Sequence, residues 1–227
     1  MPYVFIEYLK KVMKPSFLNL LFGLILLIGC SPNSSNSTIK NVEKGEQLFA
    51  EGDIIFQTST SNQSKAIQLA TNSKYSHMGI IYKNEEKFYV YEAVQPVKLT
   101  PLNEWIQRGE ESHYVVKRLK NSDAVLTDAV LAKMKQSGKR FLGKSYDIVF
   151  EWSDDKIYCS ELVWKIYKEG AGIEIGSLEE LRDFDLSNII VRTKLKERYG
   201  NSIPMNEKVI SPAAMFNSDK LVTVQNH

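Results

Sequence analysis

The 227-residue chain contains few of the residues from which metal and cofactor sites are usually built: two cysteines, three histidines and twelve glycines. The cysteines and histidines show no close ligand spacing such as His-Glu-x-x-His, so we expect no metal. The glycines follow no phosphate-cradling pattern, so we expect no nucleotide cofactor. Beyond residue 29 the chain carries 26 basic and 26 acidic residues. Without a basic surface, we expect no nucleic acid as a partner.

The longest apolar run lies near the N-terminus, over residues 17–28, and it is too short to span a bilayer comfortably. It follows three lysines and ends in Leu27-Ile28-Gly29-Cys30, which resembles the lipobox of bacterial lipoproteins. The resemblance implies a lipoprotein signal peptide over residues 1–29, lipid on Cys30 and a flexible tether over residues 30–42. Membrane lipid would then be a partner, in a bacterial cell envelope, facing the periplasm or the exterior. An uncleaved anchor helix is the alternative.

With Cys30 assigned to the anchor, Cys159 is the thiol that remains, so no intramolecular disulfide is expected. The apolar residues after it recur at the three-and-four spacing of a helix: Leu162, Val163, Ile166 and Tyr167. Cys159 therefore falls in or just before a first helical turn, where unpaired N–H groups and the helix dipole favour a thiolate. This position makes Cys159 a candidate nucleophile, and a buried structural cysteine is the alternative.

The remaining pattern predicts one domain over residues 43–227, in which an antiparallel sheet packs against helices. We expect strands over residues 54–57, 75–82, 87–94 and 114–119, and helices over residues 65–71, 102–107 and 123–137. The last helix is expected to be closed by Gly138 and to face inward through Val125, Ala129, Ala132 and Met134. The segment after Ser177 is expected to pack around the core and border the substrate cleft.

Residues 75–82 and 87–94 read as a hairpin. If its turn centres near Asn84 and Glu85, antiparallel pairing puts the partner of His77 around position 92. An imidazole and the carboxylate of Glu92 can then face each other. The alternatives are an ordinary half-buried histidine and a solvent-facing carboxylate, because a one-residue slip would reverse the face. We expect His113 to cap a strand instead of joining a site.

Three short segments match one family pattern through their joint occurrence in this order: Gly52-Asp53-Ile54-Ile55-Phe56, then residues 75–82 with Tyr91-Glu92-Ala93, then Tyr158-Cys159-Ser160-Glu161-Leu162-Val163. Together they resemble the permuted papain-like amidases, often called YiiX-like, a circularly permuted branch of the NlpC-type cysteine hydrolases. The resemblance covers roughly residues 45–170. It implies an α+β, circularly permuted papain-like fold with the nucleophile at a helix N-terminus.

Carried over by residue, the resemblance makes Cys159 the nucleophile, His77 its base and Glu92 the group that orients the imidazole. The backbone N–H of Cys159 and a second donor would bind the oxyanion, with Gln57, Tyr75 and Tyr158 as candidates. The predicted function is a lipid-anchored cysteine hydrolase that cleaves an amide, in a cell-wall peptide or a fatty-acyl amide, through a thioester. The alternative is a non-catalytic envelope module that binds a peptide or lipid in the same cleft.

Overall fold

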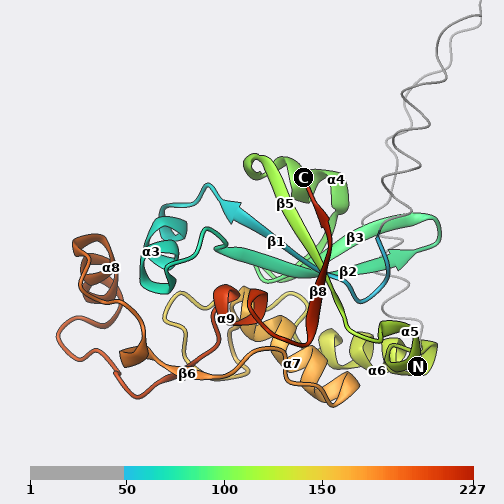
Figure 1. The fold of residues 1–227 in the computed structure, drawn as a ribbon. Helices are drawn as coiled ribbons and strands as arrows, with labels where there is room; N and C mark the ends of the chain where they lie inside the picture. The colour runs from blue at the N-terminus through green and yellow to red at the C-terminus, as the bar shows by residue number, and fades with distance from the viewer. Residues whose placement is uncertain (1–48) are drawn as a thin grey trace, which may run out of the picture. The chain divides into compact units, whose positions relative to one another are not determined.

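A six-stranded antiparallel sheet forms the centre of the computed structural model, which describes residues 49–227 (Figure 1). The predicted lipidation site Cys30 and the boundaries at residues 29 and 42 lie outside the described residues. The strand order is β4-β3-β2-β1-β5-β8. The strands are β1 (Ile54–Ser59), β2 (His77–Asn84), β3 (Lys87–Glu92), β4 (Lys98–Pro101), β5 (Gly109–Leu119) and β8 (Leu221–Asn226).

The helices differ in how they meet the sheet. α6 and α7 pack together, α7 lies against β2, and α4 contacts β3, β4 and β5. Within residues 49–227, no helix is long and apolar enough to cross a membrane. The helices are α3 (Asn62–Thr71), α4 (Leu102–Gln107), α5 (Ser122–Val125), α6 (Asp128–Lys139), α7 (Cys159–Ala171), α8 (Ile189–Tyr199) and α9 (Pro212–Phe216), with a short 3-10 turn at Leu181–Asp183.

Strand β1 shows why both faces of the sheet are covered. Its first three residues, Ile54, Ile55 and Phe56, have no exposed surface. Successive side chains of a strand point to opposite faces. Ile54 and Phe56 therefore join the main core, which includes much of α7, while Ile55 joins a second cluster that includes Trp105 of α4. The continuous apolar run of β1 thus reflects burial on two sides.

The hairpin forms, but its register differs from the prediction. Asn84 pairs with Lys87, so the turn lies at Glu85 and Glu86, and Ile80 pairs with Tyr91. Continuing this register places Gly79, two residues after His77, opposite Glu92. The expected pairing of position 77 with position 92 is therefore wrong by two residues. Because the shift is even, Glu92 keeps the same face as His77, and the two side chains are diagonal neighbours.

The predicted helix over residues 123–137 is in fact two helices. Thr127 ends the first segment and caps α6, accepting a hydrogen bond from the Val130 N–H at 3.4 Å. This new start rotates the inward face, so Ala129 and Ala132 are exposed, while Met134 is fully buried as expected. Gly138 does not close the helix but lies inside it, where an added Cβ would come within 3.2 Å of the Tyr91 and Ile166 side chains.

The C-terminal third contributes more regular structure than its pattern indicated. β8 pairs with β5 and completes the edge of the sheet, with Leu119 opposite Leu221. α8 packs on α3, and a two-stranded sheet joins β6 (Glu179–Glu180) to β7 (Lys208–Val209). This segment packs around the core, as expected.

Candidate active site

Cys159 is the first residue of α7, as its spacing from the apolar residues predicted. Tyr158, the residue before it, has an extended backbone and provides no side-chain cap. The first N–H groups of a helix have no partner within the helix, so they face the space around Cys159. The thiol is free and only 2% of the residue is exposed. A buried thiol at a helix start can be reactive only if a base reaches it.

His77 supplies that base from the first position of β2. Its Nε2 lies 2.6 Å from Oε2 of Glu92, and its ring stacks on Trp105 with 5.9 Å between centroids. The side chain of Cys159 is close enough to interact with the imidazole. Since Glu92 occupies Nε2, Nδ1 is the ring nitrogen left for the thiol. Burial lowers the pKa of His77, but the interactions with Cys159 and Glu92 outweigh it and raise the pKa to about 9.

Glu92 is fully buried, and its carboxylate accepts hydrogen bonds from four donors. Oε2 accepts hydrogen bonds from His77 and from Trp105 Nε1, the latter at 2.9 Å. Oε1 accepts from Thr100 Oγ1 at 2.5 Å and from the Arg108 guanidinium. Burial works to raise the pKa of Glu92, yet the bonds from His77 and Thr100 and the charges of His77 and Arg108 lower it to about 2. The carboxylate is therefore ionised and fixed in place.

Gly79 makes room for this arrangement. It stands opposite Glu92 in the continued register, and an added Cβ would lie 2.4 Å from Val90 Cγ1 and 2.7 Å from the Tyr91 carbonyl oxygen. It would also lie 3.4 Å from Glu92 Cβ. Without a side chain at position 79, the carboxylate reaches diagonally across to His77.

The three candidate oxyanion donors differ in their surroundings. Gln57 pairs directly with His77 across β1 and β2, and its Oε1 is buried without a hydrogen-bond partner among residues 49–227. The ring of Tyr75 stacks on Phe216 with 4.2 Å between centroids. The hydroxyl of Tyr158 accepts a hydrogen bond from the Ile210 N–H. Gln57 is therefore brought beside His77, whereas the two tyrosines are engaged elsewhere.

His113, the other internal histidine, lies outside this site. It belongs to β5, where its Nε2 is 3.1 Å from Lys74 Nζ. His113 therefore stays outside the site as expected, but it does not cap a strand, because β5 already begins at Gly109.

Two hollows meet near the thiol. The polar hollow, about 1550 Å³ including its open mouth, is lined by His77, Arg108 and amide and hydroxyl side chains, among them Gln57, Ser59, Gln63 and Gln95. The apolar pocket, about 660 Å³, reaches Cys159 from the side of α3, α8 and the C-terminal segment. Tyr146 and Ile67 line both hollows. The Cys159 and His77 pair therefore lies between a polar and an apolar chamber.

The sequence reasoning missed Thr100, Trp105, Arg108 and Tyr146. The first three approach Glu92 only because β4 pairs with β3 and α4 folds back over the sheet. Tyr146 accepts a hydrogen bond from Gln63 Nε2 at 3.2 Å, and burial, followed by the nearby charge of Cys159, raises its pKa. No local spacing marks these residues, since each is brought to the site by a tertiary contact.

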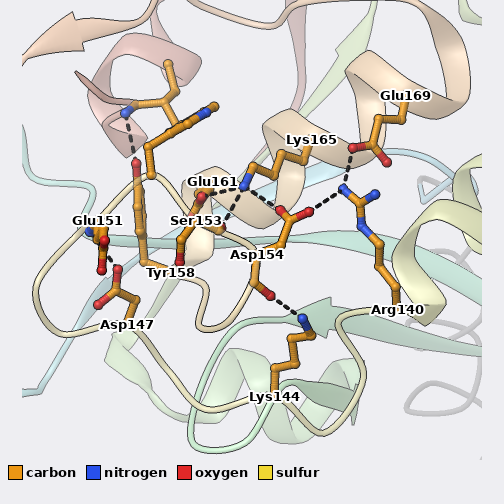
Figure 2. A network of polar contacts seen from close by, with 12 residues as sticks. Arg140, Lys144, Asp147, Glu151, Ser153, Asp154, Tyr158, Glu161, Lys165 and Glu169 are labelled. Carbon is orange, nitrogen blue, oxygen red and sulfur yellow. Dashed lines mark hydrogen bonds and ion pairs between the residues drawn. The ribbon is translucent and has the colours of Figure 1, made fainter. Parts of the chain in front are cut away.

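A polar network holds the loop that leads into α7 (Figure 2). Lys165 Nζ lies 2.8 Å from both Asp154 Oδ1 and the Ser153 carbonyl oxygen. It also forms an ion pair with the buried Glu161 at 2.7 Å, although the angle is not that of a hydrogen bond. Burial raises the pKa of Glu161 to about 7 against the opposing effect of Lys165. At the start of the loop, Asp147 accepts backbone N–H bonds within it.

Comparison with known families now identifies the fold and its chemistry. Residues 49–225 match a family model described as "Permuted papain-like amidase enzyme, YaeF/YiiX, C92 family". The chain belongs to this family. It is therefore a cysteine hydrolase of the amidase or peptidase type, and the predicted permuted papain-like α+β fold is confirmed. Membership of the C92 family favours a hydrolase over the alternative of a non-catalytic binding module.

Two relatives extend the comparison. The chain is 53% identical over 173 residues to the uncharacterized protein YiiX of Escherichia coli (strain K12), covering 76% of this chain and 84% of that one. It is also similar to the crystal structure of YiiX from Escherichia coli O157:H7, with a TM-score of 0.75 and 52% identity. That match covers 78% of this chain and 97% of the other. Nearly the whole of that crystallised chain therefore corresponds to a part of this one.

The O157:H7 protein is described as a metalloprotein, so we asked whether this site could hold a metal. Among residues 49–227, no group of three or more His, Cys, Asp or Glu side chains is arranged for a metal ion. Glu92 already accepts four hydrogen bonds, which leaves Cys159 and His77 as the two side chains able to coordinate there. Two ligands do not make a protein-held zinc site. The residues of this chain do not fit a resident metal at this position.

Proposed function

We propose that the chain hydrolyses the amide bond of a fatty-acyl amide, with Cys159 as nucleophile, His77 as base and Glu92 as the group that orients the imidazole. The single observation that carries the proposal is the placement of Cys159, the first residue of α7, beside an imidazole that is hydrogen-bonded to the buried carboxylate of Glu92. The same three chemical roles make up a Cys-His-carboxylate triad.

The hydrogen bonds define where the proton goes. His77 donates its Nε2 proton to Glu92, so the proton of the Cys159 thiol is taken up on Nδ1, and the raised pKa of the imidazole favours its staying there below about pH 9. The sulfur then attacks the substrate carbonyl, and the imidazolium returns its proton to the departing amine. A thioester on Cys159 results, and water activated by His77 hydrolyses it. Glu92 stabilises the imidazolium formed in each half of the reaction.

The negative charge on the carbonyl oxygen needs two donors. The backbone N–H of Cys159, the first residue of α7, is one. The side chain of Gln57 is the best candidate for the second donor to the oxyanion, because it lies beside His77 on the neighbouring strand and lines the polar hollow. Such a donor contributes about 10²–10³ to kcat.

The two hollows favour a fatty-acyl amide over a cell-wall peptide. The pocket that reaches Cys159 is lined mostly by apolar side chains, including Phe150, Phe184, Leu186 and Val209. A stem peptide would present charged and amide groups to this surface, whereas an acyl chain buries only apolar atoms. The amine would leave through the polar hollow on the His77 side.

Lipid anchoring is a further part of the proposal. Support comes from the sequence Leu27-Ile28-Gly29-Cys30 and the serine- and asparagine-rich residues that follow. An envelope lipoprotein with Cys30 acylated would hold the hydrolase next to a supply of acyl lipids.

Intact-mass analysis of the reaction tests the proposal. The protein is mixed with N-acyl amides of graded chain length and with muropeptides, and quenched in acid. We expect an acyl adduct on Cys159 that grows with long chains and disappears on treatment with hydroxylamine. His77→Ala should abolish the adduct, while His113→Ala, the matched control outside the site, should leave it unchanged. Adducts from muropeptides alone would contradict the substrate, and the absence of any adduct would contradict the triad.

A further inference from the structure

The outer face of α8 exposes apolar side chains. Ile189 is 65% exposed and the adjacent Ile190 is 40% exposed. Within residues 49–227, the other large hydrophobic side chains of comparable exposure are scattered one by one: Ile148, Met205 and Val222. Leaving two neighbouring isoleucines in water is unfavourable, so this pair suggests an apolar phase that contacts the start of α8.

The same helix concentrates positive charge. Over its eleven residues it carries one acidic residue, Glu197, and four basic residues: Arg192, Lys194, Lys196 and Arg198. The described chain as a whole is balanced, with 24 basic and 24 acidic residues. Ile189, Arg192 and Lys196 follow one another at intervals of three and four, so they share one helical face, and all three are exposed. That face combines an apolar end with cations.

The inner face of α8 belongs to the apolar pocket. Val191 and Leu195 are buried and line it, and Lys194 and Arg198 line it too. Apolar residues therefore lie on two sides of this helix, toward the pocket and toward the outside. In Figure 1, α8 lies at the periphery of the domain beyond α3 and away from the six-stranded sheet. A helix of this kind separates the pocket from whatever phase covers its outer surface.

We propose that the outer face of α8 docks on the surface of an anionic lipid bilayer, with Ile189 and Ile190 inserted among the acyl chains and Arg192 and Lys196 at the phosphate groups. A helix with isoleucines and cations on its outer face suits the boundary between headgroups and chains. Each cation near an anionic surface strengthens binding about fivefold. Docking in this way would place the apolar pocket against the bilayer, so an acyl chain could pass into it without crossing water.

The charge argument favours a membrane over a second copy of the chain. A dimer through the outer face of α8 would bring Arg192 and Lys196 of one copy against those of the other, whereas an anionic bilayer is complementary to them. The predicted anchor is compatible as well. The 20 residues from Cys30 to Phe49, with 19 Cα-to-Cα steps, could extend over at most about 65 Å, enough to allow the domain to reach the bilayer that holds the lipid.

Vesicle co-sedimentation tests the proposal with residues 44–227, a compact unit that the crystallised relative matches over 97% of its own length. The vesicles contain either phosphatidylcholine alone or phosphatidylcholine with 30% phosphatidylglycerol, and Cys159→Ser removes turnover. We expect binding to the anionic vesicles and at least tenfold less to the neutral ones. Ile189→Ser with Ile190→Ser should weaken binding tenfold or more. Arg192→Glu with Lys196→Glu should weaken it on the order of 30-fold.

Val222→Ser is the matched control, because Val222 is 41% exposed, like Ile190, but lies on β8. It should bind vesicles like the unsubstituted chain. Equal binding of all variants would overturn the proposal, as would self-association through Ile189 and Ile190 with no vesicle binding. The inference uses the apolar pocket of the proposed function as one ground, but its assay reads binding without turnover. Its failure can therefore be told apart from failure of the hydrolase.

Discussion

Replacing Glu92 with glutamine removes the charge of the buried carboxylate while keeping its shape. In the native site Oε2 accepts from His77 and Trp105, and Oε1 accepts from Thr100 and Arg108. Glutamine keeps one oxygen and turns the other into an NH₂ group. That new donor must face one of the two donor pairs, whichever way the amide turns.

The loss of stability follows from which donors can adapt. The Thr100 hydroxyl and the His77 ring can turn to accept a hydrogen bond, but Trp105 and Arg108 only donate. At least one of these two is left facing another donor, and the charge opposite His77 and Arg108 is gone. Breaking a buried charged pair costs about 3–5 kcal/mol. We expect a loss of about 3 kcal/mol, which lowers Tm by about 6–12 °C for a domain of this size.

The same substitution should stop the chemistry in either orientation of the amide. If the NH₂ group faces His77, Nε2 must accept and the ring proton moves to Nδ1, which then cannot take the thiol proton. If it faces Thr100 and Arg108, the ring keeps its tautomer but loses the charge that stabilises the imidazolium. The comparable change in a serine-protease triad lowers kcat by about 10⁴, and we expect a loss of about 10³–10⁴ here.

Urea unfolding followed by tryptophan fluorescence measures the first effect, and acylation of Cys159 measures the second. Thr100→Val serves as control, because it removes one of the four donors and leaves the His77 contact intact, at a cost of about 1 kcal/mol. If Glu92→Gln were as stable as the unsubstituted chain, the argument that Trp105 or Arg108 is left facing another donor would be refuted. A destabilised variant that still acylates at the native rate would show that Glu92 does not orient His77.

Three further predictions concern His77, Gly79 and Gln57. The pKa of His77 is raised from its usual value near 6.5 to about 9, so its stabilising effect is complete below about 6.5 and fades as the pH rises through about 9. Unfolding free energy should therefore decline between about pH 6.5 and pH 9, and the acylation rate should decline as the pH rises through 9 and the imidazolium that protonates the leaving amine is lost. A flat stability profile between pH 6.5 and pH 9 would contradict this. Gly79→Ala, whose Cβ would lie 2.4 Å from Val90 Cγ1, should lower both stability and alkylation of Cys159 by iodoacetamide. Gly170→Ala has a similar clash far from Glu92, so it should cost about 1–3 kcal/mol yet leave alkylation intact, and equal alkylation of the two variants would argue against a positioning role for Gly79. Gln57→Ala should lower kcat by about 10²–10³ with little change in KM, measured with the acyl amide that gives the adduct.

Local pattern was enough to predict the start of α7 and the facing of His77 and Glu92. The amphipathic spacing after Cys159 fixes the helix from adjacent residues, and strand alternation fixes the face of each hairpin residue. The register was wrong by two because the turn lies at Glu85 and Glu86 instead of Asn84 and Glu85. Glu85 has a positive φ of 53°, which glutamate rarely adopts, so its sequence gives little indication of a turn there.

The surroundings of Glu92 could not be predicted in the same way. Thr100, Trp105 and Arg108 come together only after β4 and α4 have folded over β3, and each has an ordinary local role in its own element. The same holds for β8, which pairs with β5 about a hundred residues earlier in the chain. Pairings between segments so distant in sequence depend on the whole core, and no periodicity within either segment specifies its partner.

Different segments of the fold hold the catalytic residues and form the wall of the apolar pocket, so the chemistry and the choice of substrate can vary separately. His77 and its carboxylate partner belong to the hairpin and are held by β4 and α4, while Cys159 is fixed by α7 and the network around Lys165. Within the segment after Ser177, Ile210 also holds the start of α7, through hydrogen bonds with Tyr158 and Ser160 on either side of Cys159. The α8 part of that segment makes none of these contacts and supplies part of the wall of the apolar pocket. Changes in α8 should therefore alter which acyl chains reach the thiol, and how the domain meets a bilayer, without disturbing the proton path between Cys159 and Glu92.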